Sequence, residues 1–295
     1  MTEIKSFRTL PDSQPTRHYV NRSALLTSLL GLVVLAGGGY LWYQFSLSRN
    51  AKTLYNYAEQ CAEKKDYPAA AAQFARYRQF CPNDAVARVR LAETYDLAYS
   101  KLGRVQQTIE LYHEALGVAQ ENQKGSIRCR LAELLLETRQ YVVAADEAEA
   151  MLKQEPKNAQ AANLRAKALY GQACQGTFKG KPGDVGASLE TALSRNPGDQ
   201  DTALILARIY REEPQYLSAA AHAQRVAERE KAADQILDRI VAAHPGQHEV
   251  YLARYQYRLQ YHLPGADDDL KEARRLGLED SDVRLARARQ SLRDP

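Results

Sequence analysis

A pair made of a large apolar residue and an alanine recurs along this chain, and its spacing constrains the fold more than any other feature. The alanines of the pairs are Ala58, Ala92, Ala132, Ala166, Ala207, Ala253 and Ala286. They lie 34, 40, 34, 41, 46 and 33 residues apart, and only the fourth follows a polar residue, Arg165. A period near 34 residues is typical of stacked helical hairpins. One hairpin alone leaves an apolar face exposed, so the pattern predicts a repeat array.

The first repeat shows how the two helices of a hairpin fit together. A small residue on the first helix lets a bulky residue of the second approach, and a proline ends the second helix because it lacks an N–H group. Residues 51–83 contain these types in order: Ala58, Tyr67, Ala70, Phe74, Tyr77 and Pro82. Residues 124–157 repeat them: Leu131, Ala132, Leu135, Tyr141, Ala144 and Pro156. At these offsets, residues 51–292 resemble the tetratricopeptide repeat (TPR) family.

The resemblance implies an all-α fold, an α-solenoid of about six TPR-like hairpins with a C-terminal capping helix. The units are expected at 51–83, 84–121, 124–157, 158–198, 199–246 and 247–278. The polar segment 280–292 is expected to cap the stack, or to begin a further hairpin of a longer protein. Two positions depart from the pattern, because Thr108 and Val185 stand where alanine is expected. Insertions interrupt units four (GTFKGKPG) and five (around 213–229).

An apolar segment precedes the repeats. Residues 24–45 contain no charged side chain and would reach roughly 33 Å as a helix, enough to cross a bilayer. Aromatic residues at its end, Tyr40 to Phe45, favour an uncleaved transmembrane helix over a signal peptide. The basic tail 1–23 is expected to be disordered and cytoplasmic. The sequence thus predicts a single-pass membrane protein that contacts the lipid bilayer, with its repeats extracytoplasmic, or periplasmic in a bacterium.

The residue after each alanine is expected to face the concave groove of the array. These residues are Glu59, Glu93, Glu133, Lys167, Arg208, Arg254 and Arg287, three acids followed by four bases. They predict a groove that is acidic at one end and basic at the other, and that orients a partner peptide of opposite polarity. The alternative is that they are ordinary solvated positions. Tyr55, Tyr170 and Tyr257 are expected on the same face as partner-binding anchors.

Composition and motifs argue against several other functions. The net charge is +4, half of it in residues 1–23, so the repeats have no basic excess typical of nucleic-acid binding. The four cysteines have no CxxC spacing, and Pro245 and Gly246 break the helix between His244 and His248, so no metal site is predicted. No catalytic constellation and no cofactor-binding motif is present. The chain is therefore not expected to be an enzyme.

Three functions remain open at this point. The first is a membrane-anchored scaffold or adaptor that binds proteins or peptides in the concave groove. The second is a membrane-tethered chaperone or assembly factor for secreted or envelope clients. The third is a non-catalytic subunit of a larger enzyme complex. Repeat arrays serve many processes, so the fold alone does not choose among them.

Overall fold

The computed structural model describes residues 22–99, 103–279 and 283–284, and every regular element in them is a helix. Side chains of residues 22–28 and 40–48 are outside this description. The helices are α1 (Arg22–Glu63), α2 (Tyr67–Phe80), α3 (Ala85–Tyr99), α4 (Val105–Val118), α5 (Glu121–Glu137), α6 (Tyr141–Gln154), α7 (Ala159–Cys174), α8 (Gly183–Arg195), α9 (Gln200–Arg211), the 3-10 helix η2 (Pro214–Tyr216), α10 (Ala219–His222), α11 (Val226–Ala243), α12 (His248–Gln260) and α13 (Ala266–Arg275).

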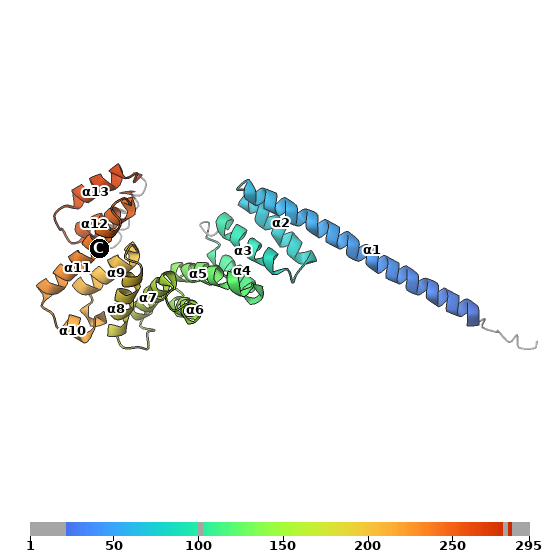
Figure 1. The fold of residues 1–295 in the computed structure, drawn as a ribbon, viewed down its shortest axis with the longest axis horizontal. Coiled ribbons are helices and arrows are strands. Elements are labelled where there is room, and N and C mark those ends of the chain that lie inside the picture. Colours follow the sequence, from blue (N-terminus) through green and yellow to red (C-terminus); the bar gives the residue numbers. More distant parts are fainter. Residues whose placement is uncertain (1–21, 100–102, 280–282, 285–295) are drawn as a thin grey trace, which may run out of the picture.

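The helices pack as antiparallel hairpins that follow one another along a curved row (Figure 1). The pairs are α1 with α2, α3 with α4, α5 with α6, α7 with α8, α9 with α11, and α12 with α13. The first helix of each hairpin also contacts the hairpin before it, so that neighbours cover each other's apolar faces. The predicted all-α solenoid is confirmed.

The recurring alanines lie where the two helices of a hairpin cross. Ala58, Ala92, Ala132, Ala166 and Ala207 are fully buried, and Ala253 is 3% exposed. A methyl side chain allows the partner helix to approach closely, and bulky residues such as Phe74 and Leu189 fill the space beside it. Ala286, and with it most of the expected capping helix 280–292, lies outside the described residues.

Short turns join α1 to α2, α5 to α6 and α12 to α13, whereas the unit-five insertion with η2 and α10 joins α9 to α11. A residue with a left-handed backbone lies in the turns after α1, α5 and α12: Lys65, Arg139 and His262 have φ of 60°, 59° and 52°. This conformation ends a helix by redirecting its last carbonyl groups. Side-chain caps start several helices, as where Asn158 accepts a hydrogen bond from the backbone N–H of Ala161 at 2.9 Å. These turns and caps therefore end one helix and start the next within a few residues.

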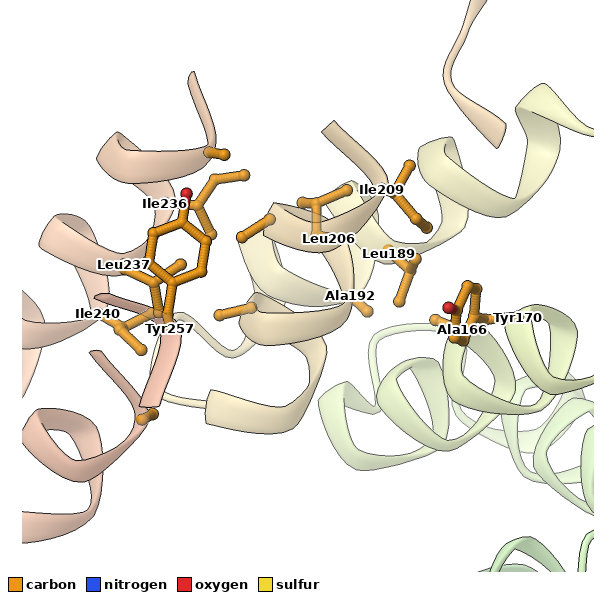
Figure 2. Close-up of a cluster of buried hydrophobic side chains, with 14 of the residues drawn as sticks. Ala166, Tyr170, Leu189, Ala192, Leu206, Ile209, Ile236, Leu237, Ile240 and Tyr257 are labelled. Atoms are coloured by element: carbon orange, nitrogen blue, oxygen red, sulfur yellow. The ribbon is translucent and has the colours of Figure 1, made fainter. Parts of the chain in front are cut away.

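The largest core cluster joins the last part of the array, from α7 to α12. Figure 2 shows side chains of this cluster from successive helices, among them Leu189 of α8, Ile209 of α9 and Ile240 of α11. The insertion of unit five takes part in it, because Leu217 is buried there. Backbone oxygens of Tyr216 and Leu217 lie so close to α8 that a Cβ on Gly186 would be 2.6 Å from one of them.

The prediction of a membrane anchor is wrong. Within the described residues, no helix is both long enough and apolar enough to span a bilayer. The predicted transmembrane segment 24–45 is the first part of α1, which continues without a break to Glu63 in the first hairpin (Figure 1). Four residues of this segment, Gly31, Gly37, Gly38 and Gly39, are glycines, which contribute little apolar surface.

The predictions that depended on this anchor are corrected with it. The single-pass topology, the extracytoplasmic placement of the repeats and the lipid bilayer as a partner have no support in the described helices. The leucines and valines of residues 29–35 are exposed in the single chain. Residues 1–21, which form most of the predicted basic tail, lie outside the described residues.

Candidate functional site

The concave side of the array holds a groove with a volume of about 1200 Å³. Its walls come from the first helices of four successive hairpins, α5, α7, α9 and α12, together with Arg139 and Tyr141 at the turn before α6. Leu136, Leu164 and Leu204 give it an apolar floor. Amide side chains line it as well: Gln160, Asn163, Asn196, Gln256 and Gln260. Such a mixture suits a ligand with alternating apolar and hydrogen-bonding groups.

Half of the predicted partner-binding residues line this groove. Glu133, Lys167 and Arg208 contribute three of its charges, and Tyr170 and Tyr257 two of its aromatic rings. Tyr55 lines a separate pocket of about 420 Å³ at the N-terminal hairpin. Glu59, Glu93 and Arg254 line neither of the two, and Arg287 lies outside the described residues.

Opposite charges pair across neighbouring hairpins at the N-terminal end of the concave side. Arg90 of α3 donates a hydrogen bond from Nε to Glu59 of α1 at 2.8 Å and contacts Glu93 at 3.2 Å. The hydrogen bond from Arg90 lowers the pKa of Glu59, and burial opposes it. Arg130 of α5 repeats the arrangement one hairpin later, with Nε 2.7 Å from Asp96 of α3 and Nη1 2.9 Å from Glu133.

The pairing continues at the C-terminal end with the signs reversed. The ammonium group of Lys167 on α7 lies 3.0 Å from Asp199 and 3.2 Å from Asp201, beside the next hairpin's first helix. Arg254 of α12 lies 2.7 Å from Asp269 and 2.8 Å from Asp238. Most charges of the predicted gradient are therefore balanced by a neighbour, which shortens the range of the field that they create.

Arg208 has a different environment. Its guanidinium stacks over the ring of Tyr170, 5.4 Å from the ring centre, and donates a hydrogen bond to the Tyr170 hydroxyl. That hydroxyl in turn donates to the carboxylate of Glu213 at 3.0 Å. Burial raises the pKa of Tyr170, so the phenol stays protonated and uncharged. The ring of Tyr216, from the unit-five insertion, packs edge-on against Tyr170.

A second arginine and tyrosine cluster borders the groove at α12. Arg211 lies over the rings of Tyr257 and Tyr261, at 5.4 and 4.9 Å from their centres. The Tyr257 hydroxyl donates to Asp234 at 2.7 Å, and the Tyr261 hydroxyl to Glu212 at 2.7 Å. Burial, followed by the hydrogen bond to Asp234, raises the pKa of Tyr257. These contacts fix the ring positions at this end of the groove.

Sequence reasoning missed the arginines that complete the charge pairs. Arg90 and Arg130 each precede a recurring alanine by two residues, a repeated offset that could have identified them. Arg211, Tyr261 and Glu213 have no such signal, because their partners lie across insertions of irregular length. No group of three or more metal-binding side chains is found in the described parts of the chain.

Asn163 stands out among the amides of the groove. It is 3% exposed, and its Oδ1 has no hydrogen-bond partner in the described structure. A buried acceptor without a donor costs free energy, about 1–3 kcal/mol, unless a ligand or water satisfies it. Asn163, which lines the groove on α7 one turn before Lys167, therefore has an unsatisfied acceptor.

Comparison with known proteins gives similar solved structures only. No family model and no curated protein matches the chain. The MamA protein is 12% identical, with a TM-score of 0.49 over 67% of this chain and 93% of that one. MamA from Desulfovibrio magneticus RS-1 is 19% identical, with a TM-score of 0.45 over 62% and 96%. YrrB, described as a TPR protein with an unusual peptide-binding site, is 14% identical, with a TM-score of 0.45 over 65% and 85%. These similarities do not establish a family.

Proposed function

We propose that this chain is an interaction scaffold that binds an extended segment of a partner protein in the concave groove. The observation that carries the proposal is the groove itself, which runs across four successive helices and combines an apolar floor with amide side chains. An extended peptide offers alternating side chains and backbone N–H and C=O groups, which match these two kinds of surface. The recurring hairpin pattern agrees with peptide binding, and so does the similarity to YrrB, which is described as a TPR protein with an unusual peptide-binding site.

The positions of the charges refine what such a groove selects. Lys167 is balanced by Asp199 and Asp201, and Glu133 by Arg130, so neither residue gives the groove a large field. Recognition therefore depends mainly on shape and hydrogen bonds, with charge acting at single positions. A specific partner segment of mixed, weakly charged composition fits this surface best.

The test begins with a pool of random nonapeptides and the purified protein. Peptides that bind are sequenced, and their affinities are measured for the wild type and for two variants. Leu204→Arg places a charge in the apolar floor of the groove, and Val143→Arg places the same charge at an exposed position of α6 outside the groove. We expect the first variant to weaken binding at least about tenfold and the second to leave it unchanged. Equal losses in both variants would contradict a groove site.

Alkylation of cysteines gives an independent measure of occupancy. Cys174 is exposed and lines the groove, whereas Cys81 is partly exposed and lies at the N-terminal pocket. A bound peptide should slow the reaction of Cys174 with iodoacetamide and leave that of Cys81 unchanged, as measured by mass spectrometry. Protection of Cys81 alone would place the peptide at the other pocket and contradict the proposal.

A further inference from the structure

Arg208 differs from the other basic residues expected along the concave side. Lys167 and Arg254 each form two ion pairs with carboxylates. Arg208 forms none with a carboxylate of the described residues, and its hydrogen bond goes to a neutral phenol instead. The Nε atom of Arg208 is buried and has no hydrogen-bond partner among the described residues. Part of its hydrogen-bonding capacity is thus unused.

Tyr170 is the reason why the nearest acid does not pair with Arg208. Glu213 of the insertion approaches Arg208, but its carboxylate accepts its hydrogen bond from the Tyr170 hydroxyl, which lies between the two. The ring of Tyr216 packs against Tyr170 and holds it in this position. The guanidinium is therefore oriented by stacking and left without a direct counter-ion.

The position of Arg208 in the groove indicates which kind of carboxylate it can bind. It belongs to α9, and the groove continues past it in both directions, to Asn163 on α7 and to Gln256 and Gln260 on α12. A bound chain would therefore extend on both sides of the guanidinium. A carboxylate that arrives there belongs to a side chain within the segment, because a chain end would leave one side of the groove empty.

We infer that Arg208 is a specificity-determining residue that binds an aspartate or glutamate side chain inside the partner segment. This inference rests on the proposed function and adds to it the groove's selectivity for an acidic side chain. Arginine pairs well with carboxylates because its planar group offers several N–H donors, and the partial burial of Arg208 strengthens the contact relative to a fully exposed one. The uncompensated amide of Asn163, one helix away, would accept a hydrogen bond from a backbone N–H of the same segment. The partner segment thus carries one acid flanked by uncharged residues.

The experiment uses the nonapeptides selected from the random pool. Each binder is resynthesised with its acidic residue changed from Glu to Gln or from Asp to Asn, and separately with an amidated C-terminus. With the wild-type protein we expect the side-chain change to weaken binding about tenfold and the amidation to have no effect. With Arg208→Gln, the acidic and amide peptides should bind with affinities that differ less than about twofold.

Control variants separate this contact from general electrostatics and from misfolding. Arg195→Gln removes the same charge from an exposed position of α8 outside the groove, and should retain the preference of the wild type. The peptide comparison on the wild-type protein needs no variant, so the inference stays testable if Arg208→Gln fails to fold. Arg208→Glu should prefer peptides with lysine at the same position, as a charge exchange requires.

The possible results distinguish the two proposals. Selected peptides without an acidic preference, or an equal preference in the wild type and in Arg208→Gln, would overturn the role of Arg208 and leave the groove as a peptide site. Sensitivity to amidation in place of the side-chain change would show that the carboxylate is a chain end, which also overturns it. If no peptide binds the groove, the scaffold function and the role of Arg208 are both wrong.

Discussion

Single residues in the groove wall decide how closely its helices approach. Gly171 on α7 faces the ring of Tyr141, and a Cβ there would lie 2.4 Å from the ring carbon Cδ1. Alanine normally stabilises a helix relative to glycine, but here its methyl group would force the tyrosine ring to move. We expect Gly171→Ala to lower the free energy of unfolding by about 1–3 kcal/mol, measured by urea denaturation.

A matched glycine-to-alanine substitution should change the free energy of unfolding in the opposite direction. Gly125 lies inside α5 and has no atom within 4 Å of the position that a Cβ would take. Gly125→Ala should therefore raise the free energy of unfolding by about 0.5–1 kcal/mol through helix propensity alone. Two losses of similar size would show that contact with Tyr141 is not the cause.

The ion pair between Glu59 and Arg90 should make the stability of the protein depend on pH. The hydrogen bond from Arg90, opposed by burial, lowers the pKa of Glu59 in the folded protein. A lowered carboxylate pKa contributes stability above the unfolded pKa of about 4.3, and this contribution is lost as the pH falls through the folded value. The difference in stability between the wild type and Glu59→Gln should be at most about 1 kcal/mol at pH 7 and should shrink below about pH 4.

The control for Glu59 lies on the same helix. Glu63 is exposed, and the described residues contain no ion pair with it, so Glu63→Gln should have the stability of the wild type throughout this range. Chemical denaturation at a series of pH values measures both variants. A difference for Glu59→Gln that grows as the pH falls would have the wrong sign for a carboxylate stabilised by Arg90.

At the scale of elements, a buried leucine contributes to holding the insertion of unit five against the array. Leu217, between η2 and α10, is 3% exposed and packs into the largest core cluster. Leu217→Ala should cost about 2–4 kcal/mol and should make residues 212–225 sensitive to proteolysis, as identified by mass spectrometry of the fragments. Val226→Ala, at a residue that is 59% exposed, is the control. Equal cleavage in both variants would mean that Leu217 does not anchor the insertion.

The elements were predictable from the sequence where the repeat is regular. The recurring alanines located the hairpins, and Thr108, a departure from the pattern, is buried with its hydroxyl donating to the backbone oxygen of Arg104 at 3.1 Å. The insertion of unit five was expected to reach residue 229, yet α11 begins at Val226. Its docking could not be predicted, because it depends on close backbone contacts with Gly183 and Gly186 of α8 that have no periodic signal.

The candidate site was predictable only in part, for a reason that concerns neighbouring repeats. A sequence orders the charges along the chain but does not say which of them meet. Arg90 reaches Glu59 and Arg130 reaches Asp96 across the interface between hairpins, so the sorted gradient becomes a series of ion pairs. The exception, Arg208, depends on Tyr170 and on the insertion that brings Glu213 close. Register between repeats and insertion geometry are tertiary properties, so periodicity alone cannot supply them.

At the scale of the whole molecule, an array of this kind should unfold in parts. One cluster of buried side chains covers α1 to α3, and the largest one covers α7 to α12, with a third between them. Each hairpin contacts only its neighbours, so a core substitution should destabilise its own region first. Leu189→Ala removes a fully buried side chain from the cluster in Figure 2, and Phe74→Ala removes one from the N-terminal cluster.

Amide hydrogen exchange measures this local response directly. Leu189→Ala should lower the protection of amides in α7 to α11 by the equivalent of about 2–5 kcal/mol and leave α2 and α3 nearly unchanged, and Phe74→Ala should do the reverse. The two variants control for each other, because both empty a buried site of the same chain. A uniform loss of protection in both would contradict a linear array and would mean that the hairpins fold as one cooperative unit. In that case a peptide in the groove would stabilise the N-terminal hairpin as much as the helices it touches.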